Sequence, residues 1–465
     1  MPYVFYDTET TGTETAFDQI LQFAAIKTDD DLNELDRFNT RCRLLPHVVP
    51  SPKALRVTRV TPARLTDSAL PSHYEMMQHI RENLLQWSPA TFVGFNSLQF
   101  DENLLRQALF QTLHPAYLTN TNGNARSDAL RVAHAASTYA PDAMVVPTDD
   151  RGEKSFRLER LASANGYEHD EAHEAMADVL ATIFLARLIR DRAPDVWQAM
   201  DRATTTNAVK EYLGTESIFS LTEYYYGRAY SCLVTPCGQN PEYHAQHAVF
   251  DLGFDPDNYR SLSVEDLVGV LNANPKVIRS LRANSQPIMM PADAAPDFTK
   301  ALQIPPGERS RRVAVIRGDA AFQARVGQAQ VLRFADKKPS AYVEQRIYDG
   351  FPNVADEALM EQFHQADWAD RASLASQIED PRIGVFARRL IYFERPDLLP
   401  NEQSAEFKAW MAERVLTDDE SVPWMTVRKA LREADDLLQN ASGEEADGLR
   451  EVKDFLLDLA ARVPT

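Results

Sequence analysis

Apolar runs and helical apolar faces alternate through the first part of the chain. Short β-rich runs predict three strands at Pro2–Tyr6, Ile20–Lys27 and Thr91–Phe95. Apolar residues spaced three and four apart predict helices over Glu102–Leu113 and His173–Arg190. This mixture predicts an α/β fold for residues 1–198.

The pattern changes twice along the rest of the chain. Over residues 199–338 proline and asparagine become more frequent, helical periodicity fades, and short strands are predicted at Ser231–Thr235 and Arg312–Ile316. We expect a small β domain there. From 339 to 465 helical faces return, and helices are predicted at Ala355–Gln365, Ile383–Phe393, Ser404–Leu416 and Asp447–Ala461.

Length, charge and cysteine content add limits to this picture. A chain of 465 residues is long enough for two or three domains. The net charge of −19 gives no basic footprint for nucleic acid, although a groove can confine positive potential locally. We expect a cytoplasmic protein that uses no membrane, because no apolar run approaches the roughly 20 residues of a membrane span and the N-terminus lacks a cleavable signal. Three cysteines suit a reducing compartment.

Two carboxylates at the end of the first strand carry the strongest chemical signal. Asp7 and Glu9 are two residues apart, so in a strand they share a face. Side-by-side carboxylates repel each other unless a cation joins them. Such a pair is more often a solvated strand face, but here a small-residue turn, Thr10–Thr13, follows an apolar strand and leaves room for a ligand.

Two further acids stand in comparable contexts. Asp101 follows the third predicted strand and opens a helix, where an isolated Asp would cap the helix. Asp178 lies on an apolar helix, where a charge is costly unless it is paired or bound to metal. His173 precedes it by five residues, and His169 is a nearby alternative. At a fraying helix start, His173 could reach over a metal site from the side.

The ordered set Asp7-x-Glu9, Asp101 and His173-x₄-Asp178 resembles the DEDDh 3′–5′ exonucleases. The resemblance implies a ribonuclease H-like core, two Mg²⁺ ions held by the four acids (with Mn²⁺ as a substitute), and histidine as general base. The chemistry agrees, because four carboxylates can hold two divalent ions and a neutral imidazole can take a proton from water.

Further segments are similar to the bacterial exonuclease I family. These are Gly94–Asp101, Ser155–Glu159, His173–Val179, Tyr348–Phe351 and Arg389–Pro396. The resemblance implies an SH3-like β domain and a helical C-terminal domain that clamp single-stranded DNA with the nuclease core. It also implies a monomer that degrades the strand processively from its 3′ end to 5′-mononucleotides, in DNA repair or recombination.

Substrate contacts are predicted from the same segments. We expect Thr8, Asn96, Phe100 and Arg157 to contact the strand. Tyr224, Tyr225 and Tyr226 could stack on unpaired bases, although a tyrosine cluster in a β domain more often packs in a core or interface.

One partner follows from the resemblance, namely the acidic, apolar C-terminal tail of single-stranded DNA-binding protein. Arg309, Arg311, Arg312 and Arg317 lie beside the predicted strand Arg312–Ile316 and could bind its carboxylates. A solvated charge run or part of the DNA groove explains these arginines equally well.

Two other functions compete. The same acids serve exoribonucleases, and the sequence names no residue that excludes a 2′-hydroxyl. A non-catalytic DNA-repair scaffold is disfavoured by the intact acid set. A zinc site at Cys232, Cys237, His244 and His247 is disfavoured by its spacing, and the chain has no P-loop.

Overall fold

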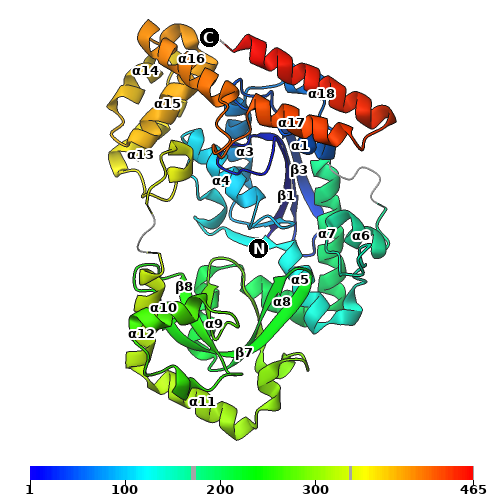
Figure 1. The fold of residues 1–465 in the computed structure, drawn as a ribbon, viewed down its shortest axis with the longest axis vertical. Helices are drawn as coiled ribbons and strands as arrows, with labels where there is room; N and C mark the ends of the chain where they lie inside the picture. The colour runs from blue at the N-terminus through cyan, green and yellow to red at the C-terminus, as the bar shows by residue number, and fades with distance from the viewer. Residues whose placement is uncertain (169–173, 335–337, 464–465) are drawn as a thin grey trace.

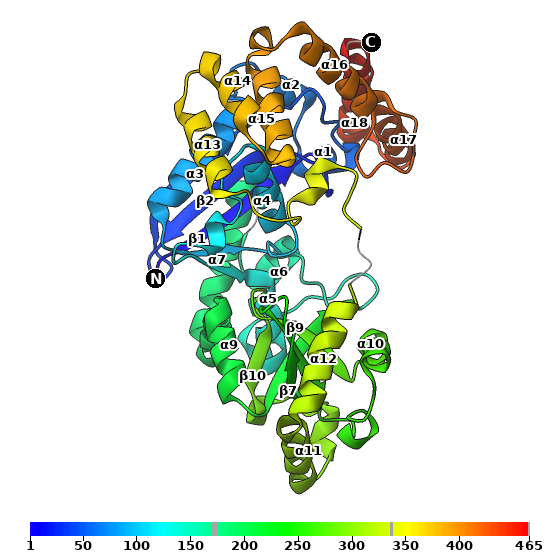
Figure 2. The ribbon, with the colours of Figure 1, turned by 90° about the vertical axis from the view of Figure 1, so that its left-hand side faces the viewer.

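The computed structural model describes residues 1–168, 174–334 and 338–463. The chain forms three regions arranged along the long axis of the molecule (Figure 1). The N-terminal region lies in the middle, a second sheet lies at one end, and the C-terminal helices lie at the other (Figures 1 and 2). The N-terminal region therefore lies between the other two regions in space (Figures 1 and 2), although it comes first in the sequence. The predicted boundaries at 198/199 and 338/339 remain predictions.

A five-stranded mixed sheet forms the centre of the N-terminal region. Its strands are β1 (Tyr3–Thr10), β2 (Ile20–Thr28), β3 (Glu34–Arg41), β4 (Thr91–Gly94) and β5 (Ala125–Asp128). The order is β3-β2-β1-β4-β5, with β1, β2 and β3 antiparallel and β1, β4 and β5 parallel. Together with the helices on both faces, this sheet confirms the predicted α/β fold of the N-terminal region.

Helices of this region cover both faces of that sheet or pack behind the helices that do. They are α1 (Pro52–Thr58), α2 (Pro62–Leu65), α3 (His73–Trp87), α4 (Asp101–Gln111), α5 (Ala129–Tyr139), α6 (Leu158–Ala164), α7 (Ala175–Arg192) and α8 (Pro194–Arg202). The two predicted helices correspond to α4 and α7, of which α7 is described only from Ala175 onward.

The two faces of β1 pack against different helices. Val4 and Tyr6 join the core formed with α3 and α4, whereas Tyr3 and Phe5 join the core formed with α7. The first strand was predicted to end at Tyr6, but its pairing with β2 continues through Thr10. Because side chains alternate along a strand, this longer β1 carries Asp7 and Glu9 on the face that α7 covers.

The second region is a five-stranded antiparallel sheet with helices beside it. The strands are β6 (Phe219–Tyr225), β7 (Arg228–Gln239), β8 (Gln246–Asp251), β9 (Ile278–Arg282) and β10 (Ile288–Pro291). Their order is β10-β6-β7-β8-β9, a four-strand meander whose fifth strand returns to the first. This arrangement is consistent with the expected SH3-like domain.

Helical content in this region exceeds the prediction. Its helices are α9 (Thr206–Thr215), α10 (Val264–Asn272), α11 (Pro306–Gly318) and α12 (Ala320–Leu332). The strand predicted at Arg312–Ile316 is wrong, because the segment lies within α11. Helix α11 begins with a proline, Pro306, which favours a helix start. Glu308 then pairs with Arg311 and Arg312 at helical spacing. The β-branched residues of Arg312–Ile316 had favoured a strand.

The third region is entirely helical among its described residues. Its helices are α13 (Val354–Gln365), α14 (Trp368–Gln377), α15 (Pro381–Glu394), α16 (Asn401–Leu416), α17 (Val427–Leu438) and α18 (Gly443–Arg462). The four predicted helices are confirmed as α13, α15, α16 and α18. Two apolar clusters join these helices to the nuclease core, one through Phe110 and Phe386 and the other through Leu55 and Val415. Over the described residues, no helix is both long and apolar enough to cross a bilayer.

Candidate active site

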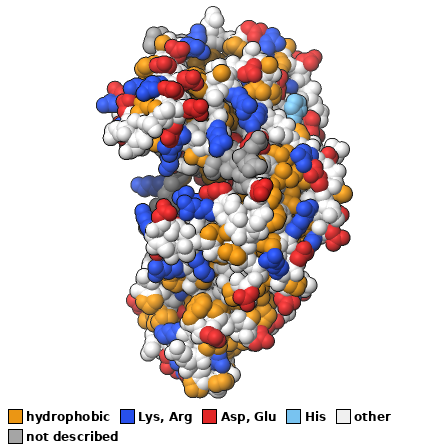
Figure 3. Space-filling model, turned by 90° about the vertical axis from the view of Figure 1, so that its right-hand side faces the viewer, with side chains coloured by type: hydrophobic (Ala, Val, Ile, Leu, Met, Phe, Trp, Pro, Cys, Tyr) orange, Lys and Arg blue, Asp and Glu red, His pale blue; other side chains and the backbone are white. Residues whose placement is uncertain are grey.

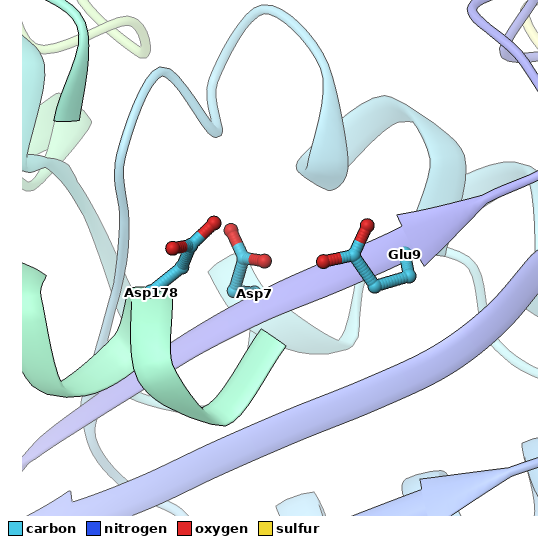
Figure 4. A group of neighbouring side chains, drawn as sticks. All are labelled: Asp7, Glu9 and Asp178. Carbon is cyan, nitrogen blue, oxygen red and sulfur yellow. The ribbon is translucent and has the colours of Figure 1, made fainter. Parts of the chain in front are cut away.

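Three carboxylates meet where β1 passes the first turn of α7. Asp7 and Glu9 extend from β1, and Asp178 extends toward them from the helix (Figure 4). One ligand oxygen from each of the three lies within 4.8 Å of the other two. The alternation of β1 and its packing on α7 therefore bring together three acids that are up to 171 residues apart in sequence.

Asp101 approaches the cluster from the opposite side of β1. It is the first residue of α4, and it is only 4% exposed. The Thr8 hydroxyl donates a hydrogen bond of 2.5 Å to its carboxylate. Burial raises the pKa of Asp101 to about 7, while the Thr8 hydrogen bond acts in the opposite direction. Asp101 is therefore held by a side chain that lies between Asp7 and Glu9 in the sequence.

The electrostatics of the cluster favour a cation. Burial raises the pKa of Asp7 well above its ordinary value, and the neighbouring Asp101 and Asp178 raise it further. Burial, Asp178 and Asp101 raise the pKa of Glu9 to about 9, against a smaller opposing effect of Arg41. Without a cation these carboxylates repel each other in a low-dielectric setting. Divalent ions that prefer oxygen ligands fit this donor set.

The expected general base is outside the described part of the chain. His173 and its alternative His169 both fall within residues 169–173, so the role of His173 remains a prediction. Glu174, the next described residue, caps α7 by accepting hydrogen bonds from the amides of Met176 and Ala177. His173 thus directly precedes, in sequence, the helix cap that positions Asp178.

Glu174 and Asp128 contribute to the site but were not predicted. Glu174 raises the pKa of Asp7 and Glu9, and it forms a 3.2 Å ion pair with Arg41. Asp128 is 1% exposed and accepts hydrogen bonds from the amides of Asn96 and Leu98, which holds the loop before Asp101. The position of Asp128 at the end of an apolar strand was the available signal.

The four predicted substrate residues lie at different depths around the site. Thr8 is buried and serves Asp101, as described above. Phe100 is the residue before α4 and packs partly into the core. Asn96 and Arg157 are exposed and both line a hollow of about 820 Å³. A second hollow of about 520 Å³ shares Asn96 with the first. Contact of these residues with a substrate remains a prediction.

The two cysteines of the rejected zinc pattern are buried in separate apolar clusters. Cys232 packs with Leu221 and Val249, whereas Cys237 packs with Phe250 and Phe322. Their separation into two apolar environments argues against a shared metal site.

Comparisons with known proteins cover nearly the whole chain. Residues 4–186 match the Exonuclease family, and residues 341–459 match the Exonuclease I C-terminal domain. Exodeoxyribonuclease I of Haemophilus influenzae is 29% identical over 381 residues, which are 77% of this chain and 79% of that protein. Exodeoxyribonuclease I of Escherichia coli is 27% identical over 434 residues, 89% of each chain.

Solved structures show the same fold. Exonuclease I from Methylocaldum szegediense is similar with a TM-score of 0.84 and 24% identity over 99% of both chains. Escherichia coli exonuclease I in complex with a dA16 oligonucleotide gives a TM-score of 0.84 and 23% identity, covering 98% of this chain and 99% of that one. Both family matches lie on this one chain, and the two exodeoxyribonuclease I relatives align with most of it. The chain therefore belongs to the bacterial exonuclease I family.

Proposed function

We propose that the protein is a 3′→5′ exodeoxyribonuclease that degrades single-stranded DNA to 5′-mononucleotides. The observation that carries this proposal is the meeting of Asp7, Glu9 and Asp178 within 4.8 Å, with Asp101 adjacent, in a chain of the exonuclease I family. A relative from Escherichia coli has been crystallised with the single-stranded oligonucleotides dA16 and dT13. An exonuclease I–DNA complex of that species also contains zinc, and we propose Mg²⁺ as the ion used here, with Mn²⁺ as a substitute.

The residues divide the chemical work between binding and proton transfer. We assign Asp7, Glu9, Asp101 and Asp178 to the metal. Ligand oxygens of Asp7, Glu9 and Asp178 converge, and burial together with neighbouring carboxylates raises the pKa of Asp7, Glu9 and Asp101, which supports a cation among them. Two divalent ions, when bound, would activate the attacking water and stabilise the leaving 3′-oxygen. His173 would take the proton of that water, which a neutral imidazole can do near neutral pH.

A strand path is supported by the hollows beside the site. The larger hollow is lined by Asn96, Lys154 and Arg157, and Tyr226 at its edge is 90% exposed. An exposed ring in a groove can stack on an unpaired base of any sequence. Figure 3 shows Lys and Arg side chains on both sides of a hollowed part of the surface. We propose that single-stranded DNA follows this surface and that its retention there makes digestion processive.

Tyr224 has a different environment from Tyr226. Its ring stacks on His134 with centroids 3.9 Å apart, and its hydroxyl lies 2.5 Å from that of Ser137. These contacts join β6 to α5, so Tyr224 packs at the contact between the two regions. Of the three tyrosines considered as base platforms, Tyr226 and the 52% exposed Tyr225 are therefore the better candidates.

The polarity and the substrate can be tested with labelled oligomers. We expect Mg²⁺-dependent release of mononucleotides from the 3′ end of single-stranded DNA. Cleavage should be slow for three other substrates: single-stranded DNA with a blocked 3′ end, a blunt DNA duplex, and RNA. Product lengths on gels from 5′- and 3′-labelled substrates give the direction. Equal rates on DNA and RNA would favour the exoribonuclease, and absence of any metal-dependent hydrolysis would favour a DNA-repair scaffold.

We also propose that the protein acts as a monomer and binds the acidic C-terminal tail of single-stranded DNA-binding protein. The predicted contacts Arg309, Arg311, Arg312 and Arg317 lie on α11. Arg311 already pairs with Asp255, Asp257 and Glu308, and Arg312 with Glu308, which reduces the positive charge available to a tail.

Fluorescence anisotropy with a labelled tail peptide tests the partner and the placement separately. We expect salt-sensitive binding to the wild-type protein, because the tail carries carboxylates. If Arg311→Ala/Arg312→Ala loses that binding and retains exonuclease activity on naked DNA, the placement on α11 is supported. Equal affinity of the double variant would move the tail site elsewhere, and no binding by the wild type would reject the partner.

A further inference from the structure

The turn that continues β1 beyond Glu9 folds back on itself through Asp18. The Thr11 hydroxyl and the Glu14 amide both donate hydrogen bonds of 2.7 Å to the Asp18 carboxylate. A β-carbon on Gly12 would lie 2.5 Å from the same carboxylate, so this position accepts only glycine without rearrangement. The path of the turn is therefore fixed from residue 11 to residue 18, directly after the Glu9 side chain.

The outer part of this turn is inserted into the helical C-terminal region. Phe17 is only 8% exposed and packs with Val422 and Trp424. Its ring centroid lies 5.5 Å from that of Trp424 and 6.0 Å from that of Tyr342. Burial of an aromatic ring between elements far apart in sequence gives a contact with defined geometry.

A buried arginine joins the same contact. The Arg414 guanidinium lies 4.5 Å from the centre of the Phe17 ring and 4.0 Å from the centre of the Trp424 ring. Its guanidinium lies 3.5 Å from Glu344, which is only 3% exposed and also pairs with Arg389 at 2.9 Å. A desolvated cation against two aromatic faces is a stronger interaction than the same pair in water.

Two hydrogen bonds hold the same turn from other directions. The Gln111 amide, at the end of α4, donates to the carbonyl of Ala16 at 3.0 Å. The Ser51 amide donates to the carbonyl of Thr11 at 2.8 Å, and the Ser51 hydroxyl donates to Glu433 on α17 at 2.6 Å. The turn after Glu9 is thus held by α4, which carries Asp101, and by two parts of the helical region.

We propose that Phe17, together with Arg414, is a positioning residue that holds Glu9 in its metal-binding position, so that the helical C-terminal region sets the metal affinity of the nuclease site. The inference rests on the proposed function, because it takes Glu9 as a metal ligand. Residues that orient the ligands of a metal, without binding the metal themselves, commonly change its affinity by about 10- to 100-fold when they are replaced.

Binding of Mn²⁺ to the full-length protein without DNA, measured by calorimetry, tests this proposal. The variants Phe17→Leu and Arg414→Lys keep an apolar side chain and a positive charge respectively, but lose the ring or the planar guanidinium. We expect both to raise the Mn²⁺ dissociation constant by about tenfold. The Mg²⁺ concentration for half-maximal hydrolysis should rise in parallel, while kcat at saturating Mg²⁺ falls less.

Arg371→Met is the matched control. Arg371 is also a buried arginine in the helical region, with its guanidinium 3.9 Å from the centre of the Trp368 ring, but it contacts Tyr74 rather than the turn. We expect it to lower the melting temperature without changing Mn²⁺ affinity.

The outcomes separate a positioning role from a stabilising one. A Mn²⁺ dissociation constant that rises about tenfold in Phe17→Leu and Arg414→Lys but is unchanged in Arg371→Met supports the proposal. If all three variants lose only thermal stability, while Glu9→Gln loses Mn²⁺ binding, the positioning role is wrong and the proposed metal site stands. If Glu9→Gln binds Mn²⁺ like the wild type, the proposed site and this inference both fail.

Discussion

Replacing Asp7, Asp101 or Asp178 by asparagine should reduce turnover of single-stranded DNA by about 10³-fold or more, because each loss removes a charged metal ligand worth several kcal/mol in the transition state. Asparagine keeps the shape of the side chain, so the fold and the affinity for DNA should change little. Single-turnover hydrolysis at saturating Mg²⁺, with DNA affinity measured in parallel, gives the comparison. Near-normal hydrolysis by any of the three variants would contradict the two-metal assignment.

Removing the charge of a carboxylate in this cluster should stabilise the metal-free protein, and Glu9→Gln is the variant that tests this. Asp7 and Glu9 are held among like charges, and the pKa of Glu9 is raised from 4.5 to about 9. A carboxyl with a raised pKa favours the folded state below its ordinary pKa, and this contribution is lost as the pH rises to the folded value. Without metal, Glu9→Gln should therefore gain stability over the wild type between pH 4.5 and 9. Thermal melts with and without Mg²⁺ provide the measurement, and Mg²⁺ should stabilise the wild type more.

Replacing His173 by alanine should lower turnover by about 10²- to 10⁴-fold, which is the usual contribution of a general base. The reason is its place in the sequence, directly before Glu174, the cap of the helix that carries Asp178. The loss should shrink at high pH, where hydroxide replaces the base-assisted water. A pH–rate profile at saturating Mg²⁺ measures both features.

His169→Ala is the natural control for that experiment. It removes an imidazole from the same segment but is four residues farther from the helix cap. We expect a much smaller loss of turnover than for His173→Ala. If His169→Ala proves the more damaging change, the assignment of the base has to move to His169.

The pairing of Asp7 and Glu9 on one face of β1 could be predicted from the sequence, because it depends only on local strand geometry. Alternation along a strand places Asp7 and Glu9 on one face whatever the rest of the fold does. The apolar face of α7 likewise predicts a buried helix, on which Asp178 needs a counter-charge. The helices of the C-terminal region were predicted for the same reason, since the apolar residues of a helix repeat within a few positions.

Only the tertiary structure decided which distant segments of the chain lie next to one another. Three carboxylates within 4.8 Å require the packing of α7 across β1, and no local pattern states this distance. The segment Arg312–Ile316 has β-branched residues that favour a strand locally, yet ion pairs and packing on the second sheet place it in α11.

The contact between Phe17 and Arg414 is the clearest example of a feature that only the tertiary structure decided. These two residues are nearly 400 positions apart, and neither has a neighbour in the sequence that predicts the other. Folding brings the helical region back over the nuclease core, and burial of the ring and the guanidinium then favours their contact. The sequence by itself predicted the candidate metal ligands and the faces that carry them. The packing of the three regions determined which residues surround those ligands, because burial and repulsion depend on neighbours that are distant along the chain.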